Sequence, residues 1–291
     1  MHIKKLYEIK RPVISFEVFP PKQESSVETV TDVLSGMAKQ KPGFISVTYG
    51  AGGHGNNSKT IEIASHIKNE LGTEPMAHLT CIGATKPQIS SILSEMKNSG
   101  IENIMALRGD IPEGFCEKDH GDFRYARDLI EFIKETGDFS IGAACYPEGH
   151  IECDSISRNY DHLYEKQQAG ADFFVSQLFF ENGTFFRFMD QATSRGITKP
   201  IVAGLMPILG KSQIQRMIFQ CGVSLPSDII RILHKYENSP EDLKKAGIDY
   251  TCRQMENLIR NGHKNIHIYS MNKPEIAMQC KAQFDSLFQE G

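Results

Sequence analysis

Two carboxylates stand beside short apolar runs, where a side chain can reach a bound substrate. Glu17 lies in a run with Phe16 and Phe19, and Asp110 follows another such run. Strand alternation predicts that Ser15, Glu17 and Phe19 share one face. A carboxyl group among phenylalanines favours its protonated form, so Glu17 is a candidate general acid. The alternative is a structural ion pair in the protein core.

A short turn beside Asp110 combines both charges with a glycine. Arg108 and Asp110 flank Gly109, which lets a ligand approach the backbone closely. A salt bridge between Arg108 and Asp110 is the alternative. His78 lies in another apolar run, where a hydrogen-bonded core histidine is the commoner situation. We predict no metal site, because no group of His, Cys and acidic residues has the spacing of metal ligands.

Aromatic and amide side chains follow two further runs. Tyr146 and His150 are separated by three residues, and Gln177 interrupts an apolar run. A buried amide needs hydrogen-bond partners, which either a ligand or a polar residue on a neighbouring strand supplies. Tyr146 and His150 could also simply pack at the edge of the fold. Taken together, these side chains suit a large planar organic cofactor or substrate better than a hydrolytic site.

Eight short apolar runs alternate with longer amphipathic stretches, and these elements must position the polar residues. Such an alternation is typical of a parallel sheet covered by helices on both faces. Eight units in 291 residues favour an α/β protein with a single (β/α)8 TIM barrel, one domain spanning 1–291, whose chemistry lies after the strands. We expect strands at 13–19, 44–49, 76–82, 103–107, 140–146, 173–179, 201–208 and 265–271, and helices that include 27–40, 58–71, 87–98, 125–136 and 157–169.

The interval between the seventh and eighth strands is long enough for two extra helices. Ser239, Pro240 and the two acids after them predict a helix start, because they combine a cap, a first-turn proline and charges that oppose the helix dipole. Gly262 is expected to end that helix. These added helices could form an interface of a homo-oligomer, a lid or simple padding.

One glycine-rich segment resembles a dinucleotide-binding turn. The segment 50–55 satisfies the pattern G-x-G-x-x-G, and it follows a strand and precedes a helix. A Rossmann site also needs an acid at the end of the next strand, which here ends Leu79-Thr80-Cys81-Ile82 without one. We therefore interpret these glycines as a barrel loop.

Composition excludes several classes of partner. A net charge of −4 argues against nucleic acid and anionic membranes, which favour basic surfaces. No apolar run is long enough for a signal peptide or a membrane span. The seven cysteines are scattered and none forms a C-x-x-C pair, so we expect reduced thiols in a cytoplasmic protein.

The strand-end residues together resemble methylenetetrahydrofolate reductase, a flavin-dependent barrel enzyme of one-carbon metabolism. The likeness covers nearly the whole chain in order, and eight short motifs in register make it specific. The matching stretches are Phe16-Glu17-Val18-Phe19-Pro20-Pro21, Val47-Thr48-Tyr49-Gly50-Ala51, His78-Leu79-Thr80-Cys81, Leu107-Arg108-Gly109-Asp110-Ile111-Pro112, Tyr146-Pro147-Glu148-Gly149-His150, Ala169-Gly170-Ala171-Asp172, Gln177 with Phe179-Phe180, and Gly204-Leu205-Met206-Pro207.

The resemblance implies a bacterial-type enzyme consisting of the catalytic domain, with FAD at the C-terminal face of the barrel. NADH or NADPH would reduce the flavin and leave, and 5,10-methylenetetrahydrofolate would then be reduced to 5-methyltetrahydrofolate. Glu17 matches the family's general acid, and Asp110 matches a carboxylate beside the flavin and the pterin. Gln177 and Gln213 match amides that hold the folate and the nicotinamide. The FAD positions implied are Thr48, Tyr49, Ala51, His78, Arg108, Gly109, Asp110, Tyr125, Ala126, Tyr146, His150, Asn159 and Lys166.

Three positions depart from the family pattern. Asn159 stands where an acid often binds the FAD ribose, with Asp161 two residues further on. Met217 stands where an aromatic residue often closes the substrate site. Lys273 replaces an arginine near the folate tail, which keeps the charge but loses the bidentate fork. These differences concern affinity and cofactor preference more than reaction type.

Two other functions are weighed against this one. A proline-dehydrogenase-like flavin enzyme would keep the flavin, reduce a quinone and ignore folate. A non-catalytic barrel that binds folate or flavin has no need of an acid beside the hydride acceptor, and the presence of both Glu17 and Asp110 argues against it.

Overall fold

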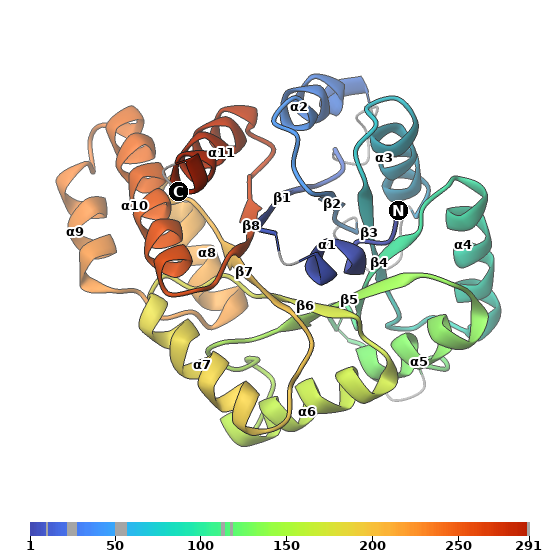
Figure 1. The fold of residues 1–291 in the computed structure, drawn as a ribbon. Helices are drawn as coiled ribbons and strands as arrows, with labels where there is room; N and C mark the ends of the chain where they lie inside the picture. Colours follow the sequence, from blue (N-terminus) through green and yellow to red (C-terminus); the bar gives the residue numbers. More distant parts are fainter. Residues whose placement is uncertain (10, 22–27, 50–56, 112–113, 117–118, 290–291) are drawn as a thin grey trace.

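A closed barrel of parallel strands forms the centre of the computed structural model (Figure 1), which describes residues 1–9, 11–21, 28–49, 57–111, 114–116 and 119–289. Each strand pairs with its sequence neighbours, and β8 pairs with β1 to close the sheet. This confirms the predicted (β/α)8 TIM barrel. The strands are β1 Val13–Val18, β2 Ile45–Val47, β3 Pro75–Thr80, β4 Asn103–Leu107, β5 Ser140–Cys145, β6 Phe173–Ser176, β7 Ile201–Leu205 and β8 Asn265–Tyr269.

All eight strands lie where the apolar runs predicted them, but most end earlier than expected. The run 173–179, for example, is a strand only as far as Ser176. Gln177 therefore lies after β6 and not on it, which corrects the predicted placement. The reason is that several apolar runs extend beyond the strand into the following loop. Leu178 and Phe179, for example, are buried but do not belong to the sheet.

Helices surround the barrel (Figure 1). Their apolar residues are buried in the core between helices and sheet. In α5, for example, Leu129, Ile130 and Ile133 are fully buried. The next helix, α6, starts at a capping Ser155 and ends at Gly170, whose φ of 113° suits a residue without Cβ. The helices outside the interval between β7 and β8 are α1 Lys4–Glu8, α2 Glu28–Ala38, α3 Asn57–Asn69, α4 Lys86–Asn98, α5 Ala126–Thr136, α6 Ile156–Ala169, α7 Asn182–Ser194 and α11 Pro274–Gln289.

Three helices fill the interval between β7 and β8, in agreement with the predicted two extra ones: α8 Lys211–Cys221, α9 Ser227–Lys235 and α10 Pro240–Arg260. The predicted start at Ser239 and end before Gly262 are both confirmed. Because α10 packs Ile248 and Leu258 into the main core, it is the regular outer helix, and α8 and α9 are the additions. Gly247 lets α10 approach closely, since a Cβ there would lie 1.9 Å from the Ile208 carbonyl oxygen.

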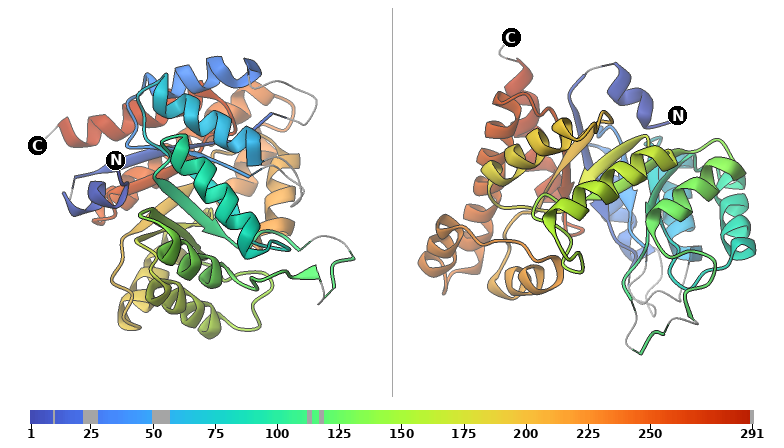
Figure 2. Two further views of the ribbon diagram at one scale, coloured as in Figure 1. Left: turned by 90° about the vertical axis from the view of Figure 1, so that its right-hand side faces the viewer. Right: turned by 90° about the horizontal axis from the view of Figure 1, so that it is seen from below.

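Helix α1 covers the end of the barrel from which the strands start. Its flanking residue Ile3 is fully buried, and Tyr7 packs on Phe173 with ring centroids 5.1 Å apart. Figure 2 shows α1 and the long loop between β4 and α5 at opposite ends of the molecule. The end of the barrel at which the strands finish is therefore the one available for a site. Within the described residues, no helix combines the length and apolar character needed to cross a bilayer.

Replacing Asn103 with alanine is expected to destabilise this closure. Its buried side chain accepts a hydrogen bond from Ile3 N at 2.7 Å and donates to the Met1 and Pro75 carbonyls at 3.1 and 3.2 Å. Removal leaves buried backbone groups unpaired, so we expect a loss of about 3 kcal/mol in the free energy of unfolding. Urea denaturation measures it, with the exposed Asn98→Ala on α4 as control. An unchanged midpoint would contradict this role for Asn103.

Candidate active site

A cavity of about 280 Å³ lies on the barrel axis at the C-terminal ends of the strands. Met76, Met105 and Val175 form its floor, because they also belong to the core cluster beneath α1. Nine of the predicted site residues line this cavity. They lie on or just after β1 to β6: Glu17, Thr48, His78, Arg108, Gly109, Asp110, Tyr146, His150 and Gln177.

Glu17 is the centre of a polar group inside the barrel. Its Oε2 lies 3.5 Å from His78 Nε2 and 3.8 Å from His267 Nε2, and it accepts a hydrogen bond from Ser46 Oγ at 3.4 Å. The Glu17 side chain is 19% exposed, so it still reaches the cavity. The carboxyl group is thus held in one place and open on one side, as a proton donor to a ligand requires.

His267 is locked in place beneath Glu17. Its Nδ1 lies 2.7 Å from Ser15 Oγ and its Nε2 lies 3.3 Å from Ser46 Oγ. Its ring also stacks on Phe44 with centroids 5.8 Å apart. Both ring nitrogens have hydroxyl partners and the residue is almost fully buried, so the imidazole keeps a single orientation toward Glu17.

Burial lowers the pKa of His78, and this effect outweighs the opposing influence of the Glu17 carboxylate. A neutral imidazole beside Glu17 suits hydrogen bonding to a ligand better than a permanent ion pair.

The polar surroundings of Glu17 differ from the expectation. Ser15 and Glu17 do share the inner face, but Phe16 packs in the outer core and Phe19 is exposed, so the predicted phenylalanine environment is wrong.

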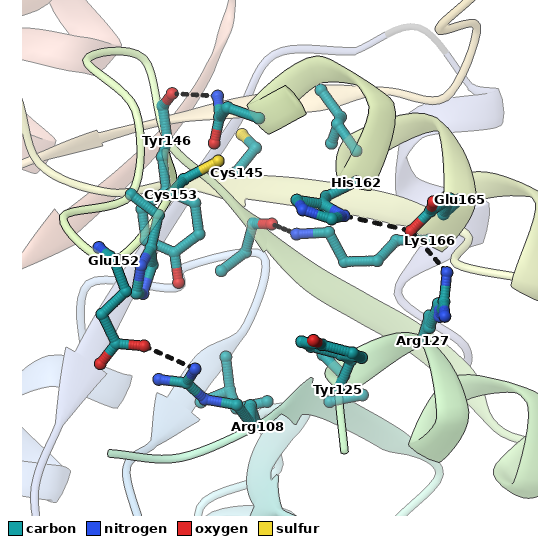
Figure 3. A pocket seen from close by; sticks show the side chains of 17 residues that line it. Arg108, Tyr125, Arg127, Cys145, Tyr146, Glu152, Cys153, His162, Glu165 and Lys166 are labelled. Atoms are coloured by element: carbon teal, nitrogen blue, oxygen red, sulfur yellow. Dashed lines mark hydrogen bonds and ion pairs between the residues drawn. The ribbon is translucent and has the colours of Figure 1, made fainter. Parts of the chain in front are cut away.

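A second cavity of about 170 Å³ adjoins the first, between β4, β5, α5 and α6 (Figure 3). The two share Arg108, Tyr146 and His150 in their linings. Tyr125, Ala126, Asn159 and Lys166, all predicted to contact FAD, also line it. The side chains predicted for one long cofactor therefore lie along one continuous depression that leads from the barrel axis to α6.

Arg108 bridges the two cavities with a partner that the sequence did not indicate. Its Nη1 donates to Glu152 Oε2 at 2.6 Å, and its Nε donates to the Gly109 carbonyl at 3.0 Å (Figure 3). The alternative of a salt bridge to Asp110 is wrong, because the carboxylate that pairs with Arg108 comes from the loop after β5. Asp110 is exposed and lines the axial cavity. Its carboxylate is available to a ligand there.

Lys166 is a half-buried cation at the base of the second cavity. Its Nζ donates to the Ala144 carbonyl and lies 5.7 Å from the centre of the Tyr146 ring. Burial lowers the pKa of Lys166 to about 8 and raises that of Tyr146 to about 12. Asn159 Nδ2 donates to the Tyr146 carbonyl at 3.0 Å, so this amide fixes the backbone after β5.

Several predicted residues lie away from these cavities. The amide of Gln213 bonds to backbone atoms of the loop before α8, accepting from Leu209 N at 2.7 Å and donating to the Pro207 carbonyl at 3.1 Å. Met217 packs in the small core beneath α8 and α9, and Lys273 lies in the loop after β8. Tyr49 is half-buried and lines neither cavity. Ala51 and the rest of the glycine-rich segment 50–55 lie outside the described residues. The elements on either side of the segment, β2 and α3, belong to the barrel.

Sequence reasoning missed His267 and Tyr269 at the axial cavity, the buried Ser46 that bonds to Glu17, and Glu152, His162 and Glu165 at the second cavity. The alternation of Ile266 and Ile268 with His267 and Tyr269 was an available signal, because strand residues two apart share a face. Nothing comparable marks Glu152, which lies in a loop.

Among the described residues, no three His, Cys, Asp or Glu side chains gather closely enough to hold a metal ion.

Comparison with known proteins agrees with the geometry. The family model described as methylenetetrahydrofolate reductase matches residues 2–284. The 5,10-methylenetetrahydrofolate reductase of Pectobacterium carotovorum subsp. carotovorum is 36% identical over 264 residues, which is 91% of this chain and 87% of that protein. Its Escherichia coli (strain K12) counterpart is 34% identical over the same share of this chain and 88% of its own length.

A plant relative and a solved structure extend the comparison. Methylenetetrahydrofolate reductase (NADH) 1 of Zea mays is 35% identical over 92% of this chain but only 47% of its own length. A solved Clostridium thermocellum protein, described as uncharacterized and binding two copies of 5-methyl-5,6,7,8-tetrahydrofolic acid, superposes with a TM-score of 0.65. It covers 98% of this chain and 99% of its own at 14% identity, which supports the fold alone. From the family match and the identities, the chain belongs to the methylenetetrahydrofolate reductase family.

Proposed function

We propose that residues 1–291 act as one catalytic barrel domain that uses NADH or NADPH and bound FAD to reduce 5,10-methylenetetrahydrofolate to 5-methyltetrahydrofolate. Family membership supports the folate reduction. The observation that carries the proposal is the arrangement of Glu17, His78 and His267 at the open end of the barrel, directly beside a cation-rich cavity. The two cavities adjoin at Arg108, Tyr146 and His150, so one elongated ligand along β4 and β5 would contact both.

The residues of the second cavity fit a flavin dinucleotide. Its lining carries three cationic side chains, Arg108, Arg127 and Lys166, against the two carboxylates of Glu152 and Glu165. No carboxylate of the described residues forms an ion pair with Lys166, so this half-buried ammonium group suits a phosphate of a ligand. When bound, FAD would supply hydride transfer between the nicotinamide and the folate.

The protein's own contribution is to place and protonate the folate. Glu17 is held by Ser46 and His267 with its carboxyl group toward the cavity, where it would donate a proton to a folate nitrogen and open the five-membered ring. The Oε1 atom of Gln177 accepts a hydrogen bond from Leu178 N at 2.9 Å. Within the described residues its NH2 group has no acceptor, which leaves that group for a ligand. Asp110 adds negative charge at the same face.

The test is spectroscopic. Purified protein should show the visible absorption of a bound flavin, bleach on addition of NADH or NADPH, and recover its absorption in stopped-flow mixing with methylenetetrahydrofolate. Recovery occurs only if the folate accepts hydride, so it separates this function from a proline-dehydrogenase-like enzyme and from a simple binder. Recovery with a quinone but not with the folate would reject the proposal, and so would a protein that takes up no flavin.

A further inference from the structure

Two cysteines on neighbouring outer helices contact each other away from the candidate active site. Cys252 lies in the middle of α10, and Cys280 lies in the first half of α11. Their side chains are hydrogen-bonded to each other, and both are free thiols. Neither residue lines the axial cavity or the second cavity, so binding of a ligand there does not use them.

The two helices that carry these thiols are packed together along the outside of the barrel (Figure 1). Helix α10 contacts α11 more extensively than it contacts any other helix. Near the start of both helices, Lys244 Nζ donates to Glu275 Oε1 at 2.7 Å. The contact between Cys252 and Cys280 is a second link further along the same two helices, so their register is fixed at two points.

This packing suits a covalent bond between the two sulfur atoms. Packed helices have axes about 8–10 Å apart and Cα atoms about 2.3 Å from each axis, so residues that face each other have Cα atoms about 3.5–5.5 Å apart. A disulfide needs a Cα separation of about 4.4–6.8 Å. The sulfur atoms of Cys252 and Cys280 already contact each other, so a bond between them requires side-chain rotation and only a small shift of either helix.

The two thiols differ in their access to solvent. Cys280 is fully buried in the main core, whereas Cys252 is half-buried and packs against the edge of that core. The hydrogen bond from the Cys280 thiol lowers the pKa of Cys252 and so favours its thiolate, which is the reactive form of cysteine. Cys252 is therefore the sulfur that an oxidant in solution reaches first, with Cys280 directly beneath it.

We propose that Cys252 and Cys280 form a redox-active site, in which a small-molecule disulfide such as oxidised glutathione converts the two thiols into a reversible disulfide between α10 and α11. The Cys252 thiolate attacks one sulfur of oxidised glutathione and releases a glutathione thiolate. The sulfur of Cys280 then attacks Cys252 Sγ and displaces the second glutathione. The protons of the two protein thiols pass through water to the two glutathione thiolates. Two protein thiols are oxidised, and one molecule of oxidised glutathione is reduced to two of glutathione.

The bond would enclose the strand that closes the barrel. Strand β8 lies between Cys252 and Cys280 in the chain and pairs with β1. A covalent ring around this segment restricts the unfolded chain more than the folded one. For a chain of this size we expect oxidation to raise the Tm by about 5 °C, and a thiol reductant to reverse the rise.

The test uses the reduced full-length protein incubated with oxidised glutathione. After remaining thiols are alkylated, trypsin digestion without reduction should give peptides 246–253 and 265–281 joined by a disulfide, as mass spectrometry detects. Scanning calorimetry of the same samples measures the Tm. Cys252→Ser and Cys280→Ala should lose both the joined peptides and the rise in Tm. Cys116→Ser is the matched control, because it removes an exposed cysteine and should keep both.

The results separate a redox-active site from two adjacent but inert thiols. A glutathione adduct on Cys252 without joined peptides overturns the proposal, and so does a disulfide from Cys252 to any other cysteine. Joined peptides with an unchanged Tm overturn the tie between α10 and α11. If Cys280→Ala does not fold, Cys252→Ser decides by itself, since this half-buried position accepts a hydroxyl. A rise in Tm that persists in Cys252→Ser also contradicts the proposal.

Discussion

Replacing Glu17 with glutamine is expected to abolish folate reduction while the reaction with the nicotinamide continues. Glutamine keeps the size of the side chain and its polar contacts, but it cannot deliver a proton. Loss of a general acid typically slows the proton-dependent step by about 10²–10⁴-fold. Hydride transfer from NADH or NADPH needs no proton from Glu17, so bleaching of the flavin should proceed at nearly the wild-type rate.

The geometry explains why His267 and Asp110 should not replace Glu17. His267 is buried beneath the carboxyl group and bonds to two serine hydroxyls, so it cannot reach the cavity in its place. The nearest other carboxylate at the cavity, Asp110, follows β4 on a different part of the wall. Both residues keep their positions in the variant, and neither presents a proton where Glu17 does.

Stopped-flow absorbance measures the two half-reactions separately. The control is Glu95→Gln, which changes an exposed glutamate on α4 and should leave both rates unaltered. Equal slowing of the two half-reactions in Glu17→Gln would mean that the residue supports the site as a whole. The role of proton donor would then be wrong.

Replacing Lys166 with methionine is expected to give the second-largest effect, a loss of FAD affinity of at least about thirtyfold. Removing one partner from a buried charge pair costs about 2–5 kcal/mol, and each 1.4 kcal/mol is a factor of ten. Methionine has a similar length and fills the same space, so the cavity should keep its shape. Lys97→Met on the exposed face of α4 is the matched control.

The same lysine predicts how FAD affinity changes with pH. Burial lowers the pKa of Lys166 to about 8, and a bound phosphate favours the charged ammonium group and so raises that pKa. Affinity is therefore greatest below pH 8, where the free protein is already protonated, and falls as the pH rises above 8. Tyr146 and Cys145 have pKa values raised to about 12 by burial and do not ionise in this range.

Fluorescence titrations between pH 7 and 9 follow this change. The wild-type protein should lose FAD affinity with rising pH, and Lys166→Met should bind weakly at every pH in the range. A variant that keeps the wild-type slope would show that another group titrates. A variant with wild-type affinity would exclude contact between Lys166 and the phosphates.

Much of the fold follows from local pattern. Strands such as Ile201–Leu205 are apolar along their whole length because helices cover one face and the barrel core covers the other, and this signal is visible without tertiary contacts. Helix ends such as Ser239 and Gly170 are also local, since capping involves residues only a few positions apart. Strand ends were less predictable because buried loop residues such as Leu178 are as apolar as the strand before them.

The amino-acid sequence by itself determined the number and order of strands and helices. It also determined the end of the barrel where Glu17, Asp110 and Gln177 lie, because parallel strands in a βα repeat all finish at the same end. Only the tertiary structure decided the partners of those residues. Arg108 pairs with Glu152 and not with Asp110, and Glu17 lies above His267, 250 positions away in the chain. Such contacts depend on how β1 and β8 meet when the barrel closes, which no local pattern of residues records.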